Sequence, residues 1–155
     1  MVVDDEADIR SLLQEILSDE GYEVRVAADA EEARRQYAEH APDLILLDIW
    51  MPGTDGISLL KEWVSRGLKS AVVMMSGHGT VDAAMEATRL GAYDFIEKPL
   101  SLSKLLRSVQ RGLDEGQRYQ DGHEGARCAQ PDQDAEYRHH QRAYGHQQDG
   151  FEGRL

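Results

Sequence analysis

The chain has 155 residues, of which 17 are Lys or Arg and 29 are Asp or Glu, so its formal net charge is −12 at pH 7. This charge argues against direct nucleic-acid binding, because affinity for a phosphate backbone comes mainly from Lys and Arg. The single cysteine, Cys128, excludes an internal disulfide framework. There is no signal-peptide pattern and no apolar run of about 18 residues, so we expect a cytoplasmic chain without a membrane span.

Up to about Gly112, short apolar runs alternate with segments of helical periodicity, which is typical of βα units around a parallel sheet. In chain order, we expect strands at Met1–Val3, Glu23–Ala27, Asp43–Leu47, Ala71–Met75 and Tyr93–Glu97. The helices that follow them are expected at Ala7–Asp19, Glu31–His40, Ile57–Arg66, Val81–Leu90 and Ser103–Leu113. The pattern predicts an α/β fold, a doubly wound (βα)5 parallel sheet between two helical layers, with strand order 2-1-3-4-5.

Local signals support several of these boundaries. Gly21 is a natural end for the first helix, and Asp29, with Glu32 three residues on, resembles a capping box at the start of the second. Beyond Leu113 the only Leu, Ile, Val or Met is Leu155, so this part of the chain has no apolar face to bury. We expect one folded domain over residues 1–116 and a disordered tail over residues 117–155, whose composition suits a truncated or frame-shifted linker.

Polar side chains follow four of the five expected strands. They are Asp4, Asp5 and Glu6 after the first strand, Asp48 after the third, Ser76 after the fourth and Lys98 after the fifth. In an open α/β sheet, ligands bind outside the carboxyl ends of the strands, where the strand order reverses. We therefore expect these side chains to form one site.

The residue types in this set favour phosphoryl transfer to an aspartate. Carboxylates gathered at one site repel one another unless a proton or a cation neutralises them, and Mg²⁺ prefers such hard oxygen ligands. A lysine ammonium and a serine hydroxyl are suited to phosphoryl oxygens. Taken singly, each residue has a structural interpretation: Asp5 as the N-cap of the first helix, Asp48 and Ser76 as turn residues, and Lys98 as a surface lysine. Their joint occurrence at one sheet edge favours the functional interpretation.

The motifs resemble the receiver domain of two-component response regulators, which has a CheY-like, flavodoxin-like fold. The resemblance covers nearly all of residues 1–115 and rests on four segments: Val2-Val3-Asp4-Asp5-Glu6, residues 46–56 (LLDIWMPGTDG), residues 75–79 (MSGHG) and residues 95–99 (FIEKP). Within the family, the chain is similar to nitrogen-regulation regulators, most of all the NtrX type. Two departures stand out, a short first strand and the absence of the family's effector domains from this sequence.

The resemblance implies a role for each matching residue at the phosphorylation site. Asp48 is implied as the phosphoacceptor, taking a phosphoryl group from a sensor histidine kinase or a small donor such as acetyl phosphate. The residues implied as Mg²⁺ ligands are Asp5, Asp48 and the backbone carbonyl of Trp50, with Asp4 binding directly or through a water. Lys98 is implied to contact the phosphoryl oxygens. The protein would catalyse its own phosphorylation and dephosphorylation without being a conventional enzyme.

The resemblance also implies a switch. Ser76 moves to hydrogen-bond the phosphoryl group and Phe95, the switch aromatic, rotates inward, although Phe95 is equally well explained as a packed strand residue. The face formed by the fourth helix, fifth strand and fifth helix then changes shape and selects a partner, which could be a second receiver in a homodimer. In full-length family members this controls sigma-54-dependent transcription of nitrogen genes.

Other functions fit the sequence less well. A haloacid-dehalogenase-type phosphatase needs a second Asp two residues after its nucleophile, where Trp50 stands. A flavodoxin-like electron carrier needs a phosphate loop after the first strand, where the acidic residues stand. A receiver-like interaction module that is not phosphorylated remains the alternative, although such a module is expected to have lost Asp48, a residue of the acidic pair or Lys98, and all of these are present. Zinc binding in the tail has no matching ligand spacing among His123, His139, His140, His146 and Cys128.

Overall fold

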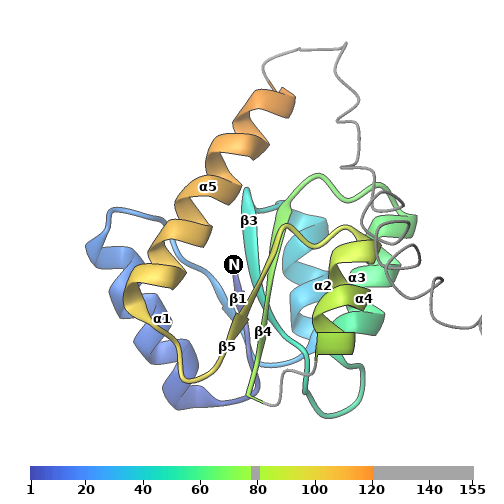
Figure 1. The fold of residues 1–155 in the computed structure, drawn as a ribbon, viewed down its shortest axis with the longest axis horizontal. Helices are drawn as coiled ribbons and strands as arrows, with labels where there is room; N and C mark the ends of the chain where they lie inside the picture. Colours follow the sequence, from blue (N-terminus) through green and yellow to red (C-terminus); the bar gives the residue numbers. More distant parts are fainter. Residues whose placement is uncertain (78–80, 121–155) are drawn as a thin grey trace, which may run out of the picture. The chain divides into compact units, whose positions relative to one another are not determined.

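The computed structural model describes residues 1–77 and 81–120, with side chains up to residue 116. Strands and helices alternate along this part of the chain (Figure 1): β1 (Val2–Val3), α1 (Ala7–Asp19), β2 (Val26–Ala27), α2 (Ala30–Glu39), β3 (Leu44–Asp48), α3 (Gly56–Ser65), β4 (Ala71–Ser76), α4 (Val81–Leu90), β5 (Asp94–Glu97) and α5 (Leu102–Gln120). All strand pairs are parallel, and the sheet order is β2-β1-β3-β4-β5. The predicted fold class and strand order are confirmed.

Two helical layers cover the sheet, with α1 and α5 on one face and α2, α3 and α4 on the other (Figure 1). Alternate residues of β3 serve the two layers: Leu44 and Leu46 pack toward α1 and α5, whereas Ile45 and Leu47 pack toward the other helices. A strand buried on both faces needs apolar residues at every position. Full burial of each such side chain stabilises the fold by roughly 1.5–3 kcal/mol.

Two of the predicted helix boundaries have clear local causes. Gly21 follows α1 with a φ of +90°, a conformation that favours glycine. The Asp29 side chain accepts a hydrogen bond from the Glu32 N–H at 2.8 Å and so caps α2. The Glu32 carboxylate in turn accepts from the Ala28 N–H at 2.9 Å, one residue before the position that a standard capping box uses.

Strand β2 is shorter than predicted, because its pairing partner is short. Only Val26 and Ala27 pair, with Val2 and Val3 of β1, whereas the sequence predicted a strand from Glu23. As β2 is the edge strand of the sheet, β1 is its only neighbour there, and a two-residue β1 leaves Glu23–Arg25 without a complete ladder.

Helix α5 runs to Gln120, whereas the sequence predicted its end at Leu113. Gly112 lies inside the helix, buried against the sheet, where an added Cβ would lie 2.7 Å from the Leu44 Cδ1 atom. The glycine therefore permits close packing and does not mark a helix end. Once a helix is nucleated, each further residue with good propensity, such as Glu115, extends it at little cost.

Two further expectations concern membrane-spanning helices and the C-terminal tail. Among residues 1–77 and 81–120, no helix is both long and apolar enough to cross a bilayer. The tail proposed to be disordered began at residue 117, but residues 117–120 belong to helix α5, so that part of the prediction is wrong. The rest of the tail and the possible zinc ligands, Cys128 among them, lie outside the described residues, from position 121 onward.

Candidate functional site

A lysine joins the carboxyl ends of three strands. Lys98 follows β5, and its Nζ lies 2.8 Å from Asp4 Oδ2, 3.4 Å from Asp48 Oδ2 and 3.8 Å from Glu6 Oε1. Asp48 is the last residue of β3, and Asp4 comes directly after β1. The parallel sheet thus brings residues that are distant in sequence to one edge. Asp4 is fully buried and Asp48 is 3% exposed, so their charges are poorly solvated and depend on Lys98.

The surroundings of Asp48 disfavour its ionised form, whereas those of Lys98 favour its charged form. Burial raises the pKa of Asp48, the charge of Asp4 raises it further, and the Lys98 ammonium and the Trp50 N–H only partly offset this, so that the pKa is about 6. Burial alone would lower the pKa of Lys98, but the hydrogen bond with Asp4 and the charge of Asp48 outweigh it and raise that pKa. Lys98 is therefore protonated at neutral pH. Asp48 is mostly ionised at that pH, although burial and the charge of Asp4 disfavour the ionised form.

Asp4, Asp5 and Glu6 form an acidic cluster in which one carboxylate oxygen of each residue lies within 4.8 Å of the others. Asp4 is held in place, since its Oδ1 accepts from the Glu6 N–H at 2.9 Å and its Oδ2 pairs with Lys98. Asp5 is exposed and makes no side-chain hydrogen bond or ion pair with the described residues. The N-cap residue of α1 is Glu6, without a side-chain cap, so the alternative role of Asp5 as N-cap is wrong.

The remaining predicted site residues lie around this centre at different depths. Ser76 ends β4, is 1% exposed, and its carbonyl accepts from the Lys98 N–H at 2.8 Å. The Trp50 side chain is 62% exposed, beside the loop that follows Asp48. Phe95 lies on β5 opposite Met74 and packs, partly buried, against the layer of α2, α3 and α4. Phe95 is thus placed as a packed strand residue, beside the elements α4 and α5.

The donor set fits a hard divalent cation. Asp4, Asp5, Glu6 and Asp48 offer four carboxylates around the Lys98 ammonium, and burial and the charge of Asp4 raise the pKa of Asp48. Carboxylate oxygens and a backbone carbonyl are the ligands that Mg²⁺ prefers. The sequence placed Glu6 in this group without giving it a role of its own, and its contact with Lys98 depends on the direction of a long side chain.

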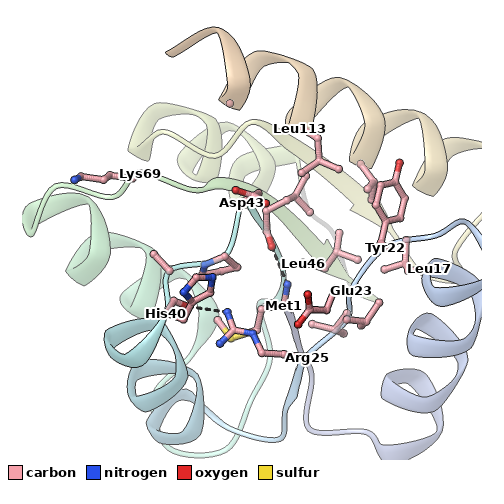
Figure 2. Close-up of a pocket in the computed structure, with 17 residues that line it drawn as sticks. Met1, Leu17, Tyr22, Glu23, Arg25, His40, Asp43, Leu46, Lys69 and Leu113 are labelled. Atoms are coloured by element: carbon pink, nitrogen blue, oxygen red, sulfur yellow. Dashed lines mark hydrogen bonds between the residues drawn. The ribbon is translucent and has the colours of Figure 1, made fainter. Parts of the chain in front are cut away.

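A cavity of about 350 Å³ lies at the opposite end of the sheet (Figure 2). It is lined at the amino ends of the strands by residues such as Met1, Arg25 and Leu44. The Met1 amino group donates to the Leu44 carbonyl at 2.8 Å. Arg25 donates to the His40 carbonyl at 2.6 Å, as Figure 2 shows. None of the acidic residues of the site lines this cavity, so the candidate site is the open edge around Lys98.

Comparisons with known proteins agree with this geometry. Residues 1–110 match the response regulator receiver domain family. The chain is 45% identical over 116 residues to the nitrogen assimilation regulatory protein NtrX of Azorhizobium caulinodans. The aligned segment covers 74% of this chain but only 26% of that protein. It is 36% identical over 114 residues to the chemotaxis protein CheY of Bacillus subtilis, covering 73% of this chain and 95% of CheY.

Among solved structures, the receiver domain of NtrX from Brucella abortus superposes with a TM-score of 0.69 at 49% identity, covering 73% of this chain and 96% of that domain. The fold, the spacing of the acidic residues and Lys98, and these similarities agree with one another. The chain belongs to the response regulator receiver domain family of two-component systems.

Proposed function

We propose that Asp48 accepts a phosphoryl group from the phosphohistidine of a sensor histidine kinase in the cytoplasm. The observation that carries this proposal is the position of Lys98, whose ammonium lies 2.8 Å from Asp4 and 3.4 Å from Asp48. A structural ion pair needs one carboxylate, whereas this lysine lies between two buried ones that compete for it. A phosphoryl group attached to Asp48 brings further negative oxygens into reach of the same ammonium.

In the proposed transfer, an Asp48 carboxylate oxygen forms a bond to phosphorus while the bond between phosphorus and the donor's histidine nitrogen breaks. With a pKa of about 6, Asp48 is mostly ionised at pH 7.5 and is available as a nucleophile. Lys98 stabilises charge on the phosphoryl oxygens. Ser76 ends the neighbouring strand, where its carbonyl accepts from the Lys98 N–H, and its hydroxyl is the proposed donor to the phosphoryl oxygens after a local movement.

Asp5, Asp48 and the Trp50 carbonyl are the proposed ligands of Mg²⁺, with Asp4 binding directly or through a water. When bound, the cation neutralises the carboxylates and the incoming phosphoryl oxygens. Asp5 is the exposed member of this set, so it can turn toward a ligand without breaking a contact to a described residue. Asp4 mainly keeps Lys98 in position.

The proposed output is a change in the face formed by α4, β5 and α5, through Ser76 and Phe95. Exposed apolar side chains on this face support it as a binding surface: Val81 is 75% exposed, Met85 52% and Leu102 53%. A second receiver is a candidate partner, giving a homodimer. By similarity to NtrX, we extend the proposal to sigma-54-dependent control of nitrogen genes by a longer protein.

Intact-mass spectrometry tests the central step. The protein is incubated with acetyl phosphate and Mg²⁺, beside Asp48→Asn and a control, Asp19→Asn, which alters an exposed aspartate at the end of α1. We expect the parent and the control to gain one phosphoryl group, and EDTA to abolish the gain. A folded parent that gains none would overturn the proposal and favour the unphosphorylated interaction module.

A further inference from the structure

Arg10 of α1 contacts the backbone of the acidic cluster. Its Nη1 donates to the Asp4 carbonyl at 2.7 Å, and its own N–H donates to the Glu6 carbonyl at 3.1 Å in the first helical turn. Charged donors make stronger hydrogen bonds than neutral ones, and this contact is partly buried. The guanidinium therefore ties the loop after β1 to the first turn of α1.

Every polar group of Asp4 is engaged. Its N–H donates to the Ala27 carbonyl at 3.1 Å, its two carboxylate oxygens accept from Glu6 and Lys98, and its carbonyl accepts from Arg10. Of these four contacts, the one to Arg10 acts on the peptide unit that leads to the next residue. Because a peptide unit is planar, fixing the Asp4 carbonyl fixes the N–H and the Cα of Asp5 as well.

The peptide unit after Asp5 is held from the other side, since the Glu6 N–H donates to Asp4 Oδ1 at 2.9 Å. The Asp5 side chain is exposed and forms no hydrogen bond or ion pair with a described residue, so the backbone fixes where the side chain starts and the carboxylate can still turn toward a ligand. We propose that Arg10 is a positioning residue that holds the Asp4–Asp5 peptide so that the Asp5 carboxylate faces the divalent cation. This inference rests on the proposed Mg²⁺ site.

The effect of removing Arg10 on Mg²⁺ affinity depends on whether Arg10 acts through its charge or by positioning Asp5. If Arg10 acted only through its positive charge, it would weaken Mg²⁺ binding by the acidic cluster in the parent. Removing it would then strengthen Mg²⁺ binding in the variant. Loss of a positioning contact instead weakens binding in the variant, by about 10- to 100-fold for groups that orient metal ligands. The direction of the change therefore separates the two roles.

The test is calorimetric titration of the metal-free protein with Mg²⁺. The parent is compared with Arg10→Ala, Arg10→Gln and the control Arg35→Ala, which removes an exposed arginine of α2 that has no described side-chain contact. We expect Arg10→Ala to raise the Kd about 10-fold or more. Arg10→Gln, which is neutral but keeps an N–H donor, should fall between it and the parent, and Arg35→Ala should match the parent.

An unchanged or tighter Kd in folded Arg10→Ala would overturn the inference while leaving the proposed function standing. A parent that shows no saturable Mg²⁺ binding would overturn the proposed metal site, and this inference with it. If circular dichroism shows that Arg10→Ala does not fold, Arg10→Gln decides: a weaker Kd than that of the parent supports positioning by Arg10, and an equal or tighter Kd contradicts it.

Discussion

Asp48 is held between two opposing influences, burial beside Asp4 and attraction to Lys98. Its pKa of about 6 lies above the ordinary value of 3.8, so between these two pH values the folded protein binds more protons than the unfolded chain. The stability contributed by this group therefore falls as the pH rises through that window. In the metal-free protein at pH 8, ionised Asp48 costs the folded state about 3 kcal/mol.

We therefore expect Asp48→Asn to stabilise the metal-free protein by roughly 2–3 kcal/mol at pH 8, because the amide has no charge to bury. Near pH 4 the gain should be much smaller, since Asp48 is then protonated in the folded state. Urea unfolding in EDTA at both pH values measures this difference. A stabilisation that is equal at pH 4 and pH 8 would show that the pKa of Asp48 is not raised.

Lys98→Met should have the opposite effect. It leaves the fully buried Asp4 without its cation, and removing one partner of a buried pair costs about 3–5 kcal/mol. It should also raise the pKa of Asp48 further, because Lys98 lowers that pKa in the parent. Urea unfolding at pH 7.5 checks the loss, with Lys104→Met on the exposed side of α5 as control. Equal stability of the two variants would contradict the account.

At the scale of elements, α3 is placed by contact between its first residue and the end of β3. The Gly56 N–H donates to the Ile49 carbonyl at 2.8 Å, and a Cβ on Gly56 would lie 2.1 Å from the Asp48 carbonyl oxygen. That obstacle is backbone, so it cannot rotate away. The position of Asp48 thus depends on a glycine at the start of α3.

Gly56→Ala should therefore lower the free energy of unfolding by about 3 kcal/mol, the upper end of the usual cost of overpacking. Gly116→Ala is the matched control in α5, where the nearest atom to an added Cβ, the Asp43 carbonyl oxygen, is 3.9 Å away. It should stabilise the helix by up to about 1 kcal/mol. Urea unfolding of both variants measures the pair, and a neutral Gly56→Ala would refute this explanation of α3 packing.

Sequence patterns predicted the elements well where burial decides the pattern. Both central strands, β3 and β4, were recognised because they are apolar at successive positions, and α2 because Asp29 caps it. The errors arise where a neighbour decides the outcome. The length of β2 depends on the length of β1, and the end of α5 was misplaced because Gly112 serves packing against Leu44, a contact that no local signal reveals.

At the scale of the whole molecule, the site could be predicted because a parallel sheet brings the carboxyl ends of its strands together. That rule needs only the position of each residue after its strand, and it placed Asp4, Asp48 and Lys98 in one group. The contacts of Arg10 and Glu6 could not be predicted, because they depend on the direction of long side chains.

Cation binding by the acidic cluster should also raise the stability of the entire domain. A ligand that binds only the folded state at about 100 times its Kd stabilises that state by about 2.7 kcal/mol. We expect Mg²⁺ to raise the free energy of unfolding of the parent by such an amount and to have much less effect on Asp5→Asn. Urea unfolding with and without Mg²⁺ measures both, and Asp19→Asn should respond like the parent.

The most direct test of the central claim is to locate the phosphoryl group. After reaction with acetyl phosphate and Mg²⁺, borohydride reduces an acyl phosphate to an alcohol, which converts a phosphorylated aspartate into homoserine. Peptide mass spectrometry then identifies the converted residue. The account predicts homoserine at position 48, and none in protein treated without the phosphate donor. Homoserine at another aspartate, with Asp48 unchanged in a folded protein, would contradict it.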